Sequence, residues 1–241
     1  MLINLRNALM TGKRTPTAKD YVQNGLVAMW DGIENAGWGV HNPNATAWKD
    51  LIGNRDWTLG TSTSYEWTAN SFDAKDQFAA TQDFIDGSLI TTVEMCAKIK
   101  MPSSITYFNT AFIIIGRQTS SGPYYGLLYR IPATLNPSLM GGRSFFEGTY
   151  NSFVGVGATF SFPDFATAGV DGYFNGEAQT ASGSNTLDYN ATTRGTVARI
   201  GGTAQHSMPI EVYNIRLYSR ALTASEIARN YAIDKARFGL P

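Results

Sequence analysis

The sequence predicts an all-β sandwich that ends in one short helix. Three observations support this fold class: short segments of alternating apolar and polar residues recur along the chain, glycine-rich turns separate them, and an aromatic content of 12% supplies bulky core side chains. Only 16% of the residues are charged, against roughly 25% in an average globular domain. A length of 241 residues fits one large sandwich.

The first third of the chain combines predicted strands with long loops. Residues 21–31 form the first predicted strand, 32–54 form a loop with several glycines, and 55–67 is rich in turns. A loop of roughly twenty residues is unusual inside a compact domain, and such loops often carry function. Residues 70–78 and 81–89 are predicted as further strands or a short helical turn.

The middle of the chain predicts a series of antiparallel strands. Residues 91–100 alternate apolar and polar side chains, and 111–116 is a continuous apolar run, typical of a strand buried on both faces. The further predicted strands are 124–131, 141–150, 153–162, 170–174, 177–180 and 196–200. Asn175-Gly176 is a strong hairpin signal because both residues accept the positive φ values of a type I′ turn.

The C-terminal segment predicts a strand followed by a capped helix. In residues 210–218, Tyr213, Ile215 and Leu217 alternate with more polar residues, the period of a half-buried strand. Thr223 lies three residues before Glu226, which predicts a capping box at a helix N-terminus. The apolar residues that follow at helical spacing are Ala224, Ile227, Ala228 and Tyr231. We expect this helix to pack on the edge of the sandwich.

Charge and composition argue against several classes of protein. The formal net charge is zero and no basic run with interleaved aromatics occurs, so we expect no nucleic-acid partner. No stretch approaches the roughly 20 apolar residues that span a bilayer, so we expect no membrane span. Cys96 is the single cysteine, which excludes an internal disulfide and predicts a small packing residue in a strand.

We expect two parts along the chain. Residues 1–20 form an arm outside the sandwich, and residues 21–241 form the sandwich domain. The arm does not have the pattern of a signal peptide, because polar residues interrupt its apolar ones. It is either a frayed tail or a segment that docks the domain onto a larger assembly.

Several motifs resemble LamG-like domains of the concanavalin A-like lectin and glucanase superfamily. The segments that carry the resemblance are GLVAMWDGIEN (25–35), WKDLIGN (48–54), TTVEMCAKIK (91–100), DGYFNGE (171–177), ARIGG (198–202) and IEVYNIRLYSRALTASEIARNY (210–231). They occur in the order in which the family has them. The resemblance implies a jelly-roll β-sandwich with a short C-terminal helix, and it does not by itself imply a function.

The sequence offers no recognisable catalytic set. Laminarinase-type relatives place carboxylates on one strand at E-x-D-x-x-E spacing, and this spacing is absent, since Glu94 and Glu211 are each the only acid in their strands. Neither His41 nor His206 lies near a nucleophile motif. We therefore expect a domain that is not an enzyme, with a carboxylate pair built across separate strands as the alternative.

No cofactor is expected, and calcium is the alternative. Lectin-like relatives often hold calcium with the Asp of an early turn and an Asp of the last strand. The resemblance matches Asp50, Gly53 and Asn54 to that turn but places Tyr213 and Asn214 where the family has an Asp-Glu pair. The other interpretation of Asp50 is a residue that caps its own turn.

Sugar binding has the best support from the residues. All five tryptophans lie in the first third of the chain, and an indole ring can stack on a pyranose while its N–H bonds a hydroxyl. The candidate sugar-binding residues are Trp38, His41, Trp57, Trp67, Tyr124 and Tyr125. For each of these aromatics a place in the core is the alternative. Trp30 and Trp48 are expected in the core.

The function predicted from these observations is carbohydrate binding or adhesion. The opening MLINLRNALM-x-GKR resembles virion proteins of gut bacterial phages and prophages, which implies a protein made in the host cytoplasm and displayed on a capsid, tail or fibre. Its partners would be a glycan and, through the arm, other virion proteins; a homo-oligomer stays open. The alternatives are a glycan-binding protein at the surface of a gut bacterium or secreted from it, and a glycoside hydrolase.

Overall fold

The computed structural model describes residues 14–59, 64–75, 79–83, 90–99, 108–117, 124–131, 138–141, 144–147, 156–164, 169–180, 197–201 and 210–240. Side chains are described for residues 14–59, 64–75, 90–98, 171–180 and 210–240.

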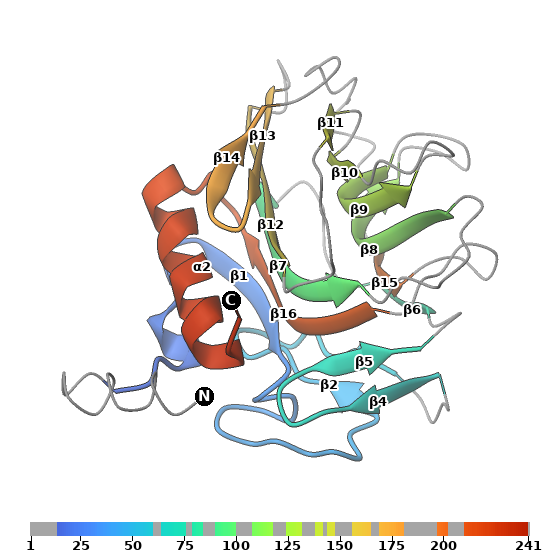
Figure 1. Ribbon diagram of the computed structural model, residues 1–241. Helices are drawn as coiled ribbons and strands as arrows, with labels where there is room; N and C mark the ends of the chain where they lie inside the picture. The colour runs from blue at the N-terminus through green and yellow to red at the C-terminus, as the bar shows by residue number, and fades with distance from the viewer. Residues whose placement is uncertain are drawn as a thin grey trace.

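Two antiparallel β-sheets form the body of the molecule, and helix α2 (Ala224–Phe238) covers one of them from outside (Figure 1). The larger sheet has the order β14-β13-β12-β7-β16-β5-β4, with β1 paired to β16, and the smaller has the order β11-β10-β9-β8-β15-β6. Strands β2 and β3 form a separate ribbon. The predicted β-sandwich with a C-terminal helix is confirmed.

The bounds of the elements agree with most predicted segments to within a few residues. In the larger sheet and the ribbon the strands are β1 (Leu26–Asp31), β2 (Ala47–Trp48), β3 (Trp57–Thr58), β4 (Tyr65–Trp67), β5 (Phe72–Ala74), β7 (Thr92–Ile99), β12 (Val156–Asp164), β13 (Gly169–Phe174), β14 (Glu177–Gln179) and β16 (Ile210–Tyr218). In the smaller sheet they are β6 (Ala79–Asp83), β8 (Phe108–Arg117), β9 (Tyr124–Ile131), β10 (Ser138–Gly141), β11 (Ser144–Glu147) and β15 (Val197–Gly201).

The first strand begins later than predicted. A short 3₁₀ helix, η1 (Ala18–Asp20), precedes it, and Tyr21 and Val22 are buried without joining the sheet. The N–H of Val22 donates to the side chain of Asn230 on α2 at 2.9 Å, so its hydrogen bond goes to the helix rather than to a neighbouring strand. Residues 14–20 therefore include part of the core, because Ala18 is fully buried with Tyr21 and Leu51.

Strand β16 is the centre of the larger sheet. It pairs with β7 along its length, and on its other side with β5 through its first three residues and with β1 through its last five. All its residues except Glu211 are buried. The predicted half-buried strand is therefore buried on both faces, because α2 covers the face that carries Asn214, Arg216 and Tyr218.

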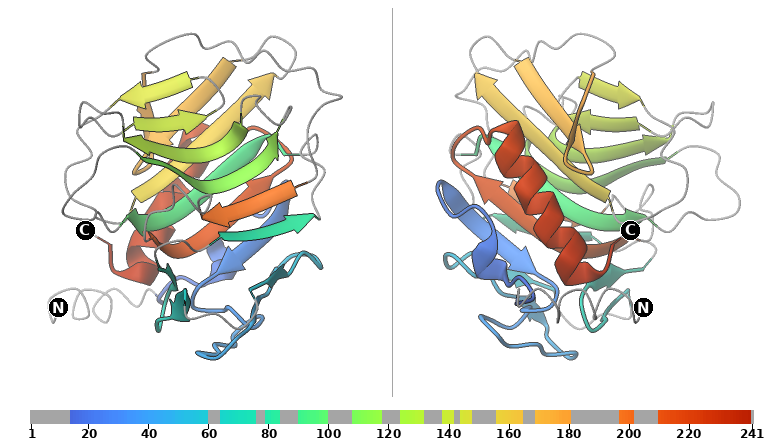
Figure 2. Two further views of the ribbon diagram at one scale, coloured as in Figure 1. Left: turned by 90° about the vertical axis from the view of Figure 1, so that its right-hand side faces the viewer. Right: turned by 60° about the vertical axis from the view of Figure 1, so that its left-hand side comes forward.

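Helix α2 has the predicted caps but a different position. The N–H of Thr223 donates to Glu226 at 2.9 Å, and the N–H of Glu226 donates back to the Thr223 hydroxyl at 3.3 Å. Gly239 ends the helix in the left-handed conformation, with φ of 67°. The helix lies across the outer face of the larger sheet rather than on its edge (Figure 2, right), because its inward side carries hydrogen-bonding groups that match those of the sheet.

The Asn175-Gly176 hairpin is confirmed. Both residues have positive φ, 53° and 80°, and they join β13 to β14. The turn packs on α2, where a Cβ on Gly176 would lie 3.2 Å from the Cβ of Tyr231. Glycine is therefore required both by the turn and by the close approach of the helix.

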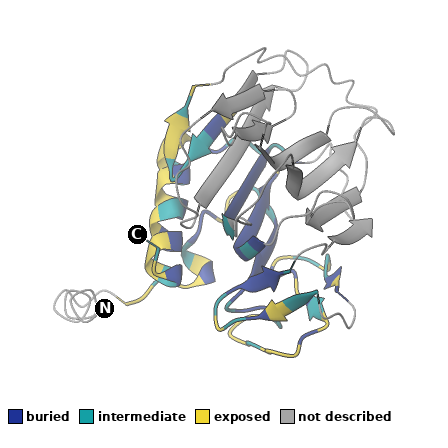
Figure 3. Cartoon of the chain, turned by 45° about the vertical axis from the view of Figure 1, so that its right-hand side comes forward, coloured by how far each residue is buried: buried dark blue, intermediate teal, exposed yellow. Residues whose placement is uncertain are grey.

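Four of the five tryptophans are buried, and Figure 3 shows the central described strands largely in dark blue, the colour of buried residues. Trp30 and Trp48 are fully buried, as predicted. Trp30 packs edge-on against Trp57 with ring centroids 5.7 Å apart, and Trp48 packs edge-on against Trp67 at 5.3 Å. Cys96 is buried against Tyr213 and Phe238, which confirms it as a packing residue. No helix among the described residues has the length and apolar character needed to cross a membrane.

Candidate functional site

The long loop that follows β1 is ordered by side chains of its own. Asp31 ends the strand, and one of its carboxylate oxygens accepts the N–H groups of Ile33 and Glu34 at 3.0 and 3.1 Å. The N–H of Gly32 donates to the carbonyl of Tyr213 at 2.7 Å, which fixes the start of the loop to the sheet. A Cβ on Gly32 would lie 2.5 Å from the carbonyl oxygen of Asn70, so only glycine fits there.

The tip of this loop is closed by further hydrogen bonds. The Asn35 amide donates to the carbonyl of Asn42 at 2.9 Å, and the N–H of Asn42 donates to the Asn35 side chain at 2.8 Å. Next to these two bonds, the N–H of Gly39 donates to Glu34 Oε2 at 2.9 Å. Gly37 and Gly39 have φ values of 126° and 70°, a conformation that favours glycine. We call residues 34–42 the Trp38 loop.

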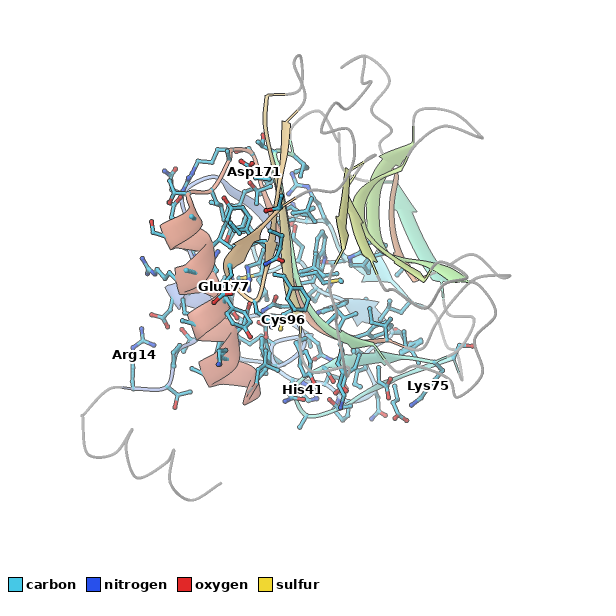
Figure 4. The ribbon with its side chains drawn as sticks, turned by 45° about the horizontal axis from the view of Figure 1, so that its top comes forward. Arg14, His41, Lys75, Cys96, Asp171 and Glu177 are labelled. Atoms are coloured by element: carbon cyan, nitrogen blue, oxygen red, sulfur yellow. The ribbon has the colours of Figure 1, made fainter. Side chains whose placement is uncertain are left out.

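Two predicted site residues, Trp38 and His41, belong to this loop. The Trp38 side chain is 39% exposed, and Val40 beside it is more exposed still. The ammonium of Lys19 lies 5.1 Å from the centroid of the Trp38 ring, a cation–π contact. His41 is half-buried with Nδ1 3.1 Å from the carbonyl oxygen of Gly32, and Figure 4 shows it near the C-terminal end of α2. The loop therefore presents an exposed aromatic ring, and η1 places the ammonium of Lys19 over it.

The structure places Trp57 and Trp67 in the core, so the expectation that they bind sugar is wrong. Trp57 is fully buried, and Trp67 is buried with its Nε1 donating to the carbonyl of Ala45 at 2.9 Å. A sugar needs a solvent-facing ring, and the Trp67 ring packs against Phe72 instead. Tyr124 and Tyr125 lie at the start of β9, and their side chains are outside the described residues.

Asp50 caps its own turn and does not suit calcium. Its Oδ1 accepts the N–H groups of Met29 and Ile52, each at 3.0 Å, and the guanidinium of Arg55 lies 3.6 Å from its Oδ2. The two hydrogen bonds that Oδ1 accepts use both of its lone pairs, and the guanidinium of Arg55 lies beside Oδ2. Asn214 turns its amide N–H toward Tyr21 and Asp234. Within the described side chains, no group of three or more His, Cys, Asp or Glu residues is placed to hold a metal.

A buried ion-pair network, which sequence reasoning missed, lies under α2. Arg216 donates through Nη1 and Nη2 to both oxygens of Asp234 at 2.7 and 2.9 Å, and through Nε to Glu94 at 2.9 Å. The side chain of Arg216 is 2% exposed. Burial raises the pKa of Glu94, and Arg216 opposes this rise. Burial disfavours the charge of Arg216, but Asp234 and Glu94 outweigh it and hold its pKa well above the ordinary value.

The network continues to the Trp38 loop through Tyr21 and Arg237. The Tyr21 hydroxyl donates to Asp234 at 2.7 Å and accepts from Arg237 at 3.2 Å. Arg237 also pairs with Asp31 and Glu34. Burial raises the pKa of the Asp31 carboxyl, and the neighbouring guanidinium of Arg237 acts in the opposite direction. The only signal in the sequence was the set of polar residues at strand and helix positions that are usually apolar.

The chain is similar to solved structures of a sialidase. No protein-family model matches the sequence, and a comparison with curated proteins finds no match. The Trypanosoma rangeli sialidase matches with a TM-score of 0.66 and 18% identity, over 92% of this chain and 34% of that chain, and the same figures hold for its complex with sialic acid. A mutant of HCR/D matches with a TM-score of 0.59 and 13% identity, over 86% and 51% of the two chains.

These likenesses show the fold and correct one expectation. The chain spans about a third of the length of the sialidases it matches. The expectation that the domain is not an enzyme is contradicted, because several of the similar structures are those of a sialidase, one of them a mutant displaying trans-sialidase activity. The absence of a carboxylate motif on one strand does not exclude a pair of carboxylates contributed by separate strands.

Proposed function

We propose that this chain is a carbohydrate-binding domain that recognises its ligand through the Trp38 loop. One observation carries the proposal: of the five tryptophans, all of which the structure describes, Trp38 alone has a substantially exposed ring. It lies on a loop whose backbone is held by several hydrogen bonds. A flat apolar face on a rigid support suits stacking against a sugar ring.

The charge around Trp38 favours an acidic sugar. Lys19 stands over the indole, and no carboxylate among the described side chains lies within ion-pair distance of it. Residues 36–46 contain no acidic residue. The sialidase with a similar fold was solved in complex with sialic acid, which supports including that sugar among the ligands. With Lys19 over one face of the indole, the sugar ring would stack on the other face, and a carboxylate on the sugar would be attracted to the nearby ammonium.

The test measures binding of sialylated, uronic-acid and neutral glycans by calorimetry, for the wild type and for Trp38→Ala. We expect Trp38→Ala to lower the affinity at least about tenfold, since a tryptophan at the centre of an interface often contributes more than the roughly 1.4 kcal/mol that this factor represents. Ile52→Ala, which removes another exposed apolar side chain, is the matched control and should bind normally. Failure of the wild type to bind any glycan would overturn the proposal.

A glycoside hydrolase activity is the second candidate, favoured by the likeness to sialidases. It is tested by incubating the full chain with sialylated glycans and measuring the free sugar released. Release that Trp38→Ala abolishes would place the reaction at the same loop. Release that this variant leaves unchanged would place it elsewhere, and no release would leave binding as the function.

Display on a phage particle is the finer proposal for where the domain acts. It is motivated by the opening segment MLINLRNALM-x-GKR, most of which lies outside the described residues. A chain without residues 1–16 should stay folded and lose incorporation into particles. If incorporation is unchanged, the arm has no docking role, and a protein at the surface of a bacterium or secreted from it becomes the better proposal.

A further inference from the structure

The C-terminal helix reaches the Trp38 loop through one side chain. Arg237 belongs to the last turn of α2, and its side chain is 3% exposed. Its guanidinium donates through both terminal nitrogens to the carboxylate of Asp31, and through Nη2 also to Glu34 Oε1 at 3.3 Å. Arg237 is separated from these two residues by about two hundred residues of sequence, so the contact depends entirely on the tertiary structure.

The two carboxylates that Arg237 contacts are the internal anchors of the loop. Asp31 accepts the N–H groups that start the loop, and the second oxygen of Glu34 accepts the N–H of Gly39, the residue next to Trp38. One guanidinium therefore pairs with both anchors at once. Without it, two neighbouring buried carboxylates would repel each other, and Glu34 would gain by turning into water and releasing Gly39.

We propose that Arg237 is a positioning residue for Trp38, so that helix α2 is a working part of the binding site and not only a cover for the sheet. Arg237 sets the orientation of Glu34, and Glu34 holds the backbone beside the indole ring. The consequence for sugar binding rests on the function proposed above. The consequence for the loop does not, and it can be measured without a ligand.

The experiment uses the fluorescence of the tryptophans in the full chain. The other four tryptophans are buried, so quenching by acrylamide reports mainly on Trp38. In Arg237→Gln we expect a higher quenching constant than in the wild type, together with an affinity for the glycan that is lower by about tenfold, the factor expected for loss of one hydrogen bond to a charged group. Melting curves are recorded alongside, and quenching is measured well below the transition.

Lys235→Gln is the matched control. Lys235 lies on the same helix, is exposed, and its ammonium lies 5.9 Å from the ring of Tyr231, so the variant removes one positive charge without touching the loop or η1. Its quenching and binding should equal those of the wild type. Glu34→Gln supplies the second test, because it keeps the size of the side chain, loses one acceptor and leaves Asp31 paired with Arg237. It should shift quenching and binding in the same direction as Arg237→Gln.

The outcomes separate the two proposals. If the quenching constants and glycan affinities of Arg237→Gln and Glu34→Gln equal those of the wild type, Arg237 does not position the loop. If Arg237→Gln does not fold, Glu34→Gln decides alone. If quenching rises in both variants but the wild type binds no glycan, the positioning role stands and the carbohydrate-binding function falls.

Discussion

Arg216 illustrates how single residues determine the stability of this protein. Its guanidinium is buried between Asp234 and Glu94. Each of its three nitrogens lies within 3 Å of a carboxylate oxygen. A two-pronged pair between a guanidinium and a carboxylate is strong because its geometry is fixed. Its burial is tolerated only while every charge keeps its partner.

Arg216→Met should therefore lower the free energy of unfolding by about 3–5 kcal/mol, because it leaves two buried carboxylates without their cation. Urea unfolding of the variant and the wild type measures the difference. Arg220→Met is the control: Arg220 pairs with Glu226, both side chains are 28% exposed, and such a pair contributes at most about 1 kcal/mol. Equal losses in the two variants would contradict the role given to Arg216.

At the scale of the element, helix α2 is closed at both ends by its own residues. Thr223 and Glu226 satisfy the first amide groups, and Gly239 allows the left-handed turn that ends the helix. The acidic Glu226 lies in the first turn, while Lys235 and Arg237 lie in the last, as the helix dipole favours. These features are local, which explains why the helix could be predicted from the sequence.

The charge of Glu226 should make the N-terminus of α2 sensitive to acid. A hydrogen bond from Arg220, followed by one from the N–H of Thr223, lowers the pKa of Glu226 from 4.5 to about 2. Because the folded-state pKa lies below the unfolded one, the stabilisation is complete above about pH 4.5 and is lost as the pH falls toward about 2.

The measurement compares urea unfolding of the wild type and Glu226→Gln between pH 6 and pH 2.5. The difference between the two proteins isolates Glu226 from Asp31 and Glu94, whose raised pKa values act in the opposite sense. We expect a constant difference at the higher pH values and a shrinking one below about pH 4.5. A difference that does not change with pH would contradict the assignment.

At the scale of the molecule, α2 is a third layer and not an appendage. The outer face of the larger sheet carries Glu94, Asn214 and Arg216, and the helix supplies Asn230 and Asp234 to meet them. The sheet is thus covered on one side by the smaller sheet and on the other by the helix (Figure 2). Asn230 and Asp234 of the helix bond to Glu94, Asn214 and Arg216 of the sheet, while Arg216 also pairs with Glu94 within the sheet, and Oδ1 of Asn214 has no hydrogen-bond partner among the described atoms.

A chain that ends after residue 220 should fail to fold cooperatively. Loss of α2 exposes the apolar side chains that pack against Ile227 and Phe238, and it removes the partners of Arg216 and Glu94. Thermal unfolding followed by circular dichroism compares it with the full chain. A truncated protein that melts in one sharp transition at the temperature of the full chain would show that the helix is dispensable.

The sequence by itself determined the features that depend on neighbouring residues. The alternation in β16, the capping box at Thr223 and the turn at Asn175-Gly176 each act over a few residues, and each lies where the sequence placed it. The fold class followed from them, because strands joined by tight turns stack into a sandwich. The exposed Trp38 was also found, since its surrounding glycines mark a loop.

The tertiary structure alone decided which side chains reach solvent. Trp38 and Trp57 look alike in the sequence, yet one faces water and the other is buried against Trp30, because burial depends on residues far away in the chain. In the same way, the polar side of β16 lies beneath α2, and Arg237 contacts Glu34 across 203 residues of sequence. A local pattern fixes the direction in which a side chain points, and only the packing of distant elements fixes what it meets there.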